Sequence, residues 1–135
     1  MTSILHILAI IGLFSVIERI VNMLRSKTVY IIDDDPVSLA MLEAKLKSSR
    51  FKVRCFSSVK GVAPKIALAV PDFVIVDYDL NDSITGENIY DFCTRHGIPV
   101  AIYTATPEAI SSEKRVFSKM GSDPLGAVSN FLKTV

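Results

Sequence analysis

Residues 28–36 read TVYIIDDDP, a short apolar run that ends in three consecutive aspartates and a proline. A run of this length, rich in β-branched and aromatic residues, predicts a buried strand. Asp35 followed by Pro36 predicts a helix N-cap and the first turn of a helix. The apolar positions of that helix share one face: Val37, Ala40, Met41 and Ala44. The segment therefore predicts a strand, an acidic turn and a helix.

The same alternation continues from Lys27 to the end of the chain. Further strands are predicted at Phe51–Phe56, Asp72–Val76, Pro99–Tyr103 and Arg115–Ser118. Helices are predicted at Val59–Val70, Glu87–Arg95 and Pro124–Leu132, the last with an apolar stripe of its own. Strands that alternate with helices are typical of an α/β fold in which helices cover both faces of a parallel sheet. No linker or low-complexity tract interrupts this part of the sequence.

The N-terminal segment has a different composition. Residues 4–17 are almost continuously apolar, and residues 18–24 are amphipathic before Arg25 and Lys27. Three hypotheses follow: a helix that spans or lies on a membrane, a helix that pairs with a copy of itself through residues 4–24, or translation that starts at Met23. The basic residues after the helix would keep the remainder of the chain on the cytoplasmic side of a membrane. We therefore divide the chain into an N-terminal helix, residues 1–26, and a globular domain, residues 27–135.

Composition excludes several classes of function. The 135 residues are enough for one domain, and 15 basic against 14 acidic residues give a net charge of +1, which gives no reason to expect nucleic acid as a partner. Cys55 and Cys93 lack CxxC spacing, so we expect free thiols in a cytosolic protein. His6 and His96 form no ligand cluster with them in the sequence, which argues against zinc.

Polar residues follow four of the five predicted strands. They are Asp33 and Asp34 after the first strand, Asp77 and Asp79 after the third, Thr104 after the fourth and Lys119 after the fifth. The carboxyl ends of parallel strands meet at one edge of a sheet, where ligands of open α/β sheets bind. Crowded carboxylates need a hard cation, and Mg²⁺ prefers such oxygen ligands. The pattern predicts a magnesium site at that edge.

A carboxylate at such a site can attack phosphorus and form an aspartyl phosphate. Asp77 suits the role of nucleophile, and Lys119 would neutralise the phosphoryl oxygens. The hydroxyl of Thr104 could hydrogen-bond the new phosphoryl group. These residue types predict a switch controlled by phosphorylation.

The motifs IIDDDP, VIVDYDL and YTA, followed by a late lysine, occur in an order that resembles the receiver domains of two-component response regulators, the CheY-like family. The resemblance covers residues 27–135. It implies a flavodoxin-like, doubly wound sheet of five parallel strands in the order 2-1-3-4-5. It also implies that Asp33 and Asp34 bind Mg²⁺, that Asp77 accepts phosphate and binds the metal, and that Asp79 offers its backbone carbonyl to the metal. Thr104 and Lys119 complete the set.

Three features depart from the family pattern. Met120 follows Lys119 where the family usually has proline, and Val116 replaces the aromatic residue expected three positions before the lysine. Phe117 or Tyr103 could substitute for that aromatic residue. Only 14 residues separate Thr104 from Lys119, so the fourth helix of the domain is expected to be short or absent.

We therefore expect a stand-alone, non-enzymatic signalling module without an attached output domain. A histidine kinase or phosphotransfer protein would supply the phosphoryl group, and output would pass through an unidentified protein. The expected location is the cytoplasm, with attachment to the inner face of the membrane through the N-terminal helix as one option. Two alternatives stay open: a receiver-like docking or oligomerisation scaffold that is not phosphorylated, and an aspartyl phosphatase of the haloacid dehalogenase type that uses Asp77 and Asp79.

Overall fold

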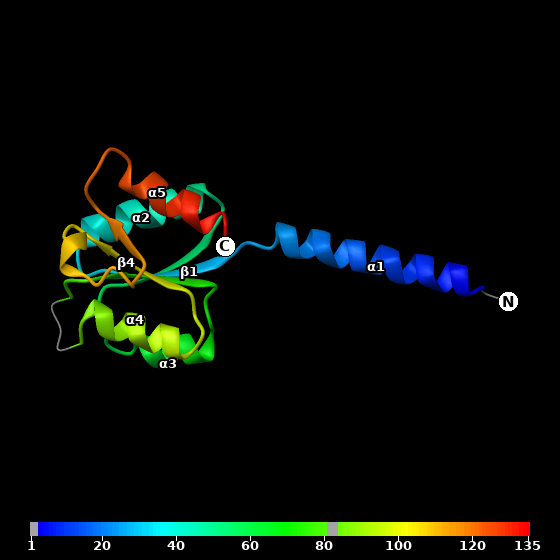
Figure 1. Cartoon of the computed structure of the whole chain (residues 1–135), viewed down its shortest axis with the longest axis horizontal. Coiled ribbons are helices and arrows are strands. Elements are labelled where there is room, and N and C mark those ends of the chain that lie inside the picture. The colour runs from blue at the N-terminus through cyan, green and yellow to red at the C-terminus, as the bar shows by residue number, and fades with distance from the viewer. Residues whose placement is uncertain (1–2, 81–83) are drawn as a thin grey trace.

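The computed structural model describes residues 3–80 and 84–135, which form a five-stranded sheet with helices on both faces and a separate helix at the N-terminus (Figure 1). The strands are β1 (Thr28–Ile32), β2 (Lys52–Phe56), β3 (Phe73–Asp77), β4 (Val100–Thr104) and β5 (Val116–Ser118). They pair in parallel in the order β2-β1-β3-β4-β5. The fold class and the strand order predicted from the sequence are confirmed.

Helices α2 (Pro36–Ser48) and α5 (Pro124–Leu132) cover one face of this sheet, and α3 (Val62–Leu68) and α4 (Gly86–Arg95) cover the other (Figure 1). Alternate residues of a strand point to opposite faces, so each strand contributes to two separate cores. In β1, Val29 and Ile31 lie in the core under α2 and α5, and Tyr30 and Ile32 lie in the core under α3 and α4. Burial on both faces explains why the strands are almost continuously apolar.

The apolar face that the sequence predicted for α2 is wrong, because all four of its residues are exposed. Val37 is 65% exposed, Met41 is 53% exposed, and Ala40 and Ala44 are exposed as well. The buried residues of α2 are Leu42 and Leu46 instead. The leucines lie four residues apart on the face that meets β1, β2 and α5, so this face buries the larger apolar area. Val37 and Met41 are therefore available on the surface of the domain.

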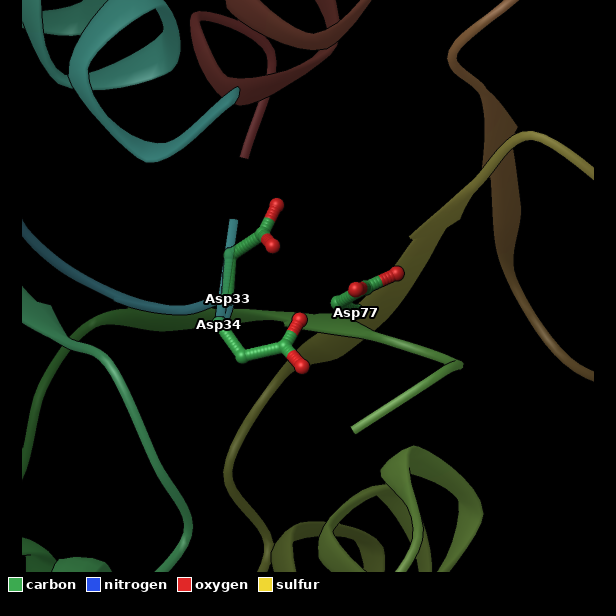
Figure 2. A group of neighbouring side chains, drawn as sticks. All are labelled: Asp33, Asp34 and Asp77. Carbon is green, nitrogen blue, oxygen red and sulfur yellow. The ribbon is translucent and has the colours of Figure 1, made fainter. Parts of the chain in front are cut away.

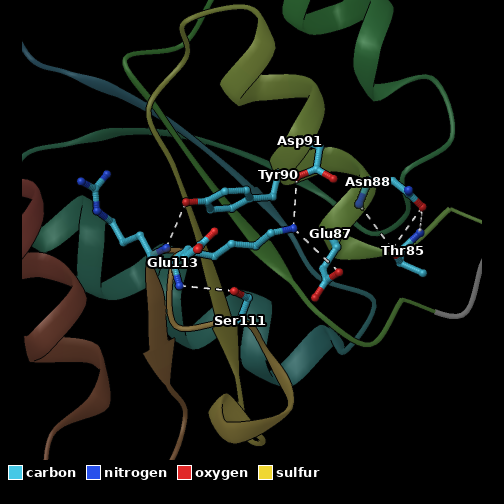
Figure 3. A network of polar contacts seen from close by, with 9 residues as sticks. Thr85, Glu87, Asn88, Tyr90, Asp91, Ser111 and Glu113 are labelled. Carbon is cyan, nitrogen blue, oxygen red and sulfur yellow. Dashed lines mark hydrogen bonds and ion pairs between the residues drawn. The ribbon is translucent and has the colours of Figure 1, made fainter.

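The connection between β4 and β5 contains only a short 3-10 helix, Pro107–Ala109, in place of an α-helix. The expectation of a short or absent fourth helix is confirmed. Polar contacts hold this connection against α4 (Figure 3). The hydroxyl of Tyr90 accepts a hydrogen bond from the backbone N–H of Arg115 at 3.0 Å, and the Lys114 ammonium pairs with Asp91 at 3.1 Å and Glu87 at 3.8 Å. Together with buried Ile110, these contacts attach the connection to the rest of the domain.

Helix α1 (Ile4–Leu24) extends away from the sheet, from the end at which β1 begins (Figure 1). Ser3 caps it by accepting a hydrogen bond from the backbone N–H of His6. Its large apolar side chains from Ile4 to Val21 are exposed. Within the described residues, this is the one helix whose length and composition suffice to cross a membrane, with a mean hydropathy of 2.2 over Ile4–Val21.

Candidate functional site

The carboxyl edge of the sheet brings together the polar residues that were predicted to form a site. Asp77 is the last residue of β3 and Thr104 is the last residue of β4, so the strand ladder fixes both backbones. Asp33 and Asp34 follow β1 directly, and Lys119 follows β5. Segments far apart in the sequence therefore meet at this edge.

Three carboxylates form a cluster in which one oxygen of each residue lies within 4.8 Å of the others: Asp33, Asp34 and Asp77. Their side chains turn toward a common region beyond the strand ends (Figure 2). Asp33 and Asp77 are buried and Asp34 is half-buried, so water screens their mutual repulsion poorly. Hard oxygen ligands at this separation fit a divalent cation such as Mg²⁺.

Lys119 is the cationic partner within this cluster. Its ammonium donates to Asp33 Oδ2 at 2.9 Å and lies 3.4 Å from Asp77 Oδ1. Burial alone would lower the pKa of Lys119, but the hydrogen bond to Asp33 and the charge of Asp77 outweigh this effect and raise it. Lys119 therefore stays protonated at neutral pH and faces the proposed nucleophile.

Asp77 is a carboxylate whose ionised form is disfavoured by its surroundings. Burial is the main cause, the negative charge of Asp33 adds to it, and the pKa of Asp77 rises from 3.8 to about 6. Lys119 and the backbone N–H of Asp79 oppose the rise by stabilising the charged carboxylate. A bound divalent cation would favour the charged form further, because it adds positive charge next to the carboxylate.

The remaining predicted site residues have distinct positions. Thr104 is completely buried, and its hydroxyl oxygen accepts a hydrogen bond from the backbone N–H of Thr106 at 3.1 Å. The side chain of Asp79 is exposed and is not part of the three-carboxylate cluster. Asp35 caps α2 by accepting from the backbone N–H of Val37, and its own N–H donates to Asp33 Oδ1 at 2.9 Å. The capping bond fixes the acidic turn in front of the helix.

Gly86 lies against the backbone of Asp77, a close approach that the sequence prediction missed. A Cβ atom at this position would overlap the carbonyl oxygen of Asp77, far inside any permitted contact. The first turn of α4 can therefore approach the end of β3 only with glycine at this position. Thr85 supplies the N-cap of the same helix through a capping box with Asn88 (Figure 3). The only sequence signal was the threonine–glycine pair that precedes a helical pattern.

The two aromatic residues that were considered as substitutes for the aromatic residue expected at position 116 lie on the face of the sheet opposite to Val116. Tyr103 and Phe117 pack in the core under α2 and α5. Val116 packs in the other core, and Thr104 has the same orientation as Ile102 in that core because the two residues alternate with Tyr103 along β4. Helix α4 places the rings of Tyr90 and Phe92 beside this core, and Tyr90 also contacts the β4–β5 connection.

No known family model matches the chain, and no curated protein matches it. Solved structures do. The chain has a TM-score of 0.68 and 16% identity with chemotaxis protein CheY4 of Vibrio cholerae, covering 82% of this chain and 99% of that one. The isolated REC domain of RcsB from Salmonella enterica serovar Typhimurium gives a TM-score of 0.68 at 17% identity, with 82% and 90% covered.

The anti-anti-sigma factor PhyR of Bartonella quintana gives a TM-score of 0.62 at 21% identity over 87% of this chain. The chain spans about half of that protein, 52% of its length, and 44% of a second PhyR structure. Identities this low establish the fold alone. The chain has the receiver fold, in agreement with the resemblance seen in its sequence.

Proposed function

We propose that the chain is a phosphorylation-dependent signalling module in which Asp77 accepts a phosphoryl group from a phosphohistidine of a kinase or phosphotransfer protein. The observation that carries the proposal is the cluster of Asp33, Asp34 and Asp77 with Lys119 paired to two of them. Asp77 is the last residue of β3 and is only 7% exposed. It can therefore be reached from the carboxyl edge of the sheet. Such an arrangement suits a nucleophile better than a solvated turn.

In the proposed step, an oxygen of Asp77 attacks the phosphorus and the bond between phosphorus and the donor histidine nitrogen breaks. The electron pair of that bond stays with the histidine, and the product is an aspartyl phosphate. Lys119 places its ammonium 3.4 Å from Asp77 Oδ1, where it can neutralise charge on the transferring group. Asp33 keeps Lys119 in this position through the 2.9 Å hydrogen bond.

Asp33, Asp34 and Asp77 would hold Mg²⁺ when it is bound, and the ion would supply positive charge to the phosphoryl oxygens. We expect Asp79 to contribute its backbone carbonyl, as the family resemblance implies. Thr104 ends the neighbouring strand, and its hydroxyl can exchange its contact with Thr106 for the phosphoryl group. This exchange would alter the start of the β4–β5 connection and would carry the signal.

The surface beside Asp77 suits a protein as the phosphoryl donor. A hollow of about 320 Å³ lies between α2 and α5, lined by Met41, Tyr103, Lys119 and Leu125 among others. The exposed side chains of Val37 and Met41 border it. An apolar border next to the nucleophile can bind a helix of the donor protein, whereas a small phosphate ester needs polar groups that enclose it.

Intact-mass analysis tests the proposal. The chain is incubated with acetyl phosphate and Mg²⁺, beside Asp77→Asn and beside a sample without Mg²⁺. We expect one phosphoryl adduct that requires both Asp77 and the metal. No adduct, together with no binding of beryllofluoride, would support the scaffold hypothesis instead. Continuous turnover of p-nitrophenyl phosphate would favour the phosphatase hypothesis.

A further inference from the structure

Helix α1 is apolar around its whole circumference. At 100° per residue, Ile4, Leu8 and Ile11 lie on one side and are 75%, 57% and 59% exposed. On the opposite side, Ile10, Leu13 and Ile17 are 65%, 61% and 50% exposed. A helix that pairs with a copy of itself buries one stripe and needs a polar outer face, which is absent here from Ile4 to Ile17. An environment that is apolar around the whole helix, such as the interior of a bilayer, suits α1 better than a single partner helix does.

The length of α1 matches the same surroundings. The apolar window Ile4–Val21 contains 18 residues, which at 1.5 Å per residue extend about 27 Å, close to the thickness of a bilayer's hydrocarbon core. Its charged residues, Glu18 and Arg19, lie near the end that leads to the sheet, where long side chains reach the lipid headgroups.

Positive charge gathers where α1 joins the domain. Five basic residues lie at the part of the amino edge next to α1, β1 and β2: Arg25, Lys27, Arg50, Lys52 and Lys133. The backbone N–H of Lys52 donates to the carbonyl of Lys27 at 2.9 Å, and four of the five residues line a hollow of about 270 Å³. Asp72, an acidic side chain beside this group, accepts a hydrogen bond from the backbone N–H of Thr28. The carboxyl edge has the opposite charge, because the aspartates lie there.

Arg50 is unusual within this basic edge. Its φ of 70° lies in the left-handed region, which disfavours residues with a Cβ atom, and it is the one non-glycine residue with such a φ among those described. Its side chain is exposed. Arg50→Gly therefore removes a positive charge without a loss of stability, because glycine adopts this φ without strain.

We infer that α1 inserts into a bilayer that contains anionic lipids and that the basic amino edge of the sheet rests on the lipid phosphates. In this orientation the edge with Asp77 faces away from the membrane. The inference rests on α1 and the basic edge and does not depend on phosphorylation. Charge complementarity selects anionic lipid: each basic residue near such a surface strengthens binding about fivefold, the equivalent of about 1 kcal/mol.

The first test concerns insertion. The full chain is reconstituted into phosphatidylcholine vesicles with phosphatidylglycerol, washed with alkaline carbonate and floated on a density gradient. We expect the chain to stay with the vesicles, and the double variant Leu8→Asp/Leu13→Asp to be washed off. Loss of the unaltered chain in the wash would overturn insertion. A discrete lipid-free dimer that dissociates in the double variant would also overturn it, in favour of a second copy as the partner of α1.

The second test measures the basic edge in the background of the double variant, which keeps the whole chain but removes insertion. We expect weak binding to vesicles with phosphatidylglycerol and none to phosphatidylcholine alone. Arg50→Gly should reduce binding about fivefold while its melting temperature stays equal or rises, so that unfolding cannot explain the loss. Lys60→Gln, which removes one exposed charge after β2 at the other edge, is the matched control and should bind normally. Equal losses in the two variants, or no binding at all, would overturn the proposed orientation.

Discussion

Replacing Asp77 with asparagine removes a charge that the fold holds in a buried position beside Asp33. Mainly through burial, folding raises the pKa of Asp77 from 3.8 to about 6. One pKa unit corresponds to about 1.4 kcal/mol. The rise in the pKa of Asp77 therefore means that the metal-free folded state is about 3 kcal/mol less stable with Asp77 ionised than with Asp77 protonated. Asparagine avoids this penalty but leaves Lys119 with only Asp33, so we expect a net gain of about 2 kcal/mol at neutral pH.

The gain depends on pH in a defined direction. Because the pKa of Asp77 is higher in the folded state, its favourable contribution is complete below pH 3.8 and is lost as the pH rises through about 6. The advantage of Asp77→Asn should therefore be largest above about pH 7 and should vanish near pH 4. For a domain of this size, about 2 kcal/mol corresponds to a rise of about 8 °C in melting temperature.

Thermal unfolding followed by circular dichroism measures the effect, with EDTA present and α1 kept soluble by a non-ionic detergent. Asp79→Asn removes an exposed carboxylate two residues away and serves as the control, with an expected change within about 0.5 kcal/mol. An Asp77→Asn variant that is less stable than the original at neutral pH would refute the electrostatic description of the site. The same would hold for a gain that is equal at the two ends of the pH range.

Three further perturbations test separate parts of the site. Mg²⁺ at about 100 times its dissociation constant should raise the unfolding free energy by about 2.7 kcal/mol, and Asp34→Asn should remove most of this rise in calorimetry. Gly86→Ala should lower the free energy of unfolding by about 1–3 kcal/mol in denaturant titrations, because its Cβ would displace the carbonyl of Asp77. It should also slow formation of the phosphoryl adduct. An unchanged rate of adduct formation would contradict the close approach of Gly86 to Asp77. Tyr90→Phe should cost about 1 kcal/mol and speed amide exchange at Arg115 in hydrogen-exchange mass spectrometry, while adduct formation at Asp77 continues.

Local sequence signals were sufficient for most of the fold. Runs such as residues 28–32 contain only residues that suit a doubly buried strand, and Asp35–Pro36 marks a helix start that the structure confirms. The predicted ends of the elements differ where tertiary contacts decide. The helix expected over residues 59–70 forms only at Val62–Leu68, after Gly61 with a φ of 74°. In α2, the choice between two partly apolar faces depended on which face meets the sheet, and a sequence window cannot show this.

The site was predictable to the extent that its residues end strands. Asp77 and Thr104 could be placed at one edge because parallel strands align their carboxyl ends. The pairing of Lys119 with Asp33 and the need for glycine at position 86 were not predictable, because each depends on a distance between segments far apart in the sequence. The loop after Asp79 includes residues 81–83, which lie outside the described residues.

The two proposals place different tasks at opposite edges of one sheet. Each strand runs from the basic amino edge to the acidic carboxyl edge, so a chain held at a membrane by α1 presents Asp77 to the aqueous side. A donor protein could then approach the hollow between α2 and α5 without contacting the bilayer. In the proposed switch, a conformational change that starts at Thr104 would reach the β4–β5 connection, which Tyr90 and Lys114 attach to α4. Because this connection contains only a short 3-10 helix, we expect a partner of the proposed phosphorylated state to recognise α4 and the connection itself.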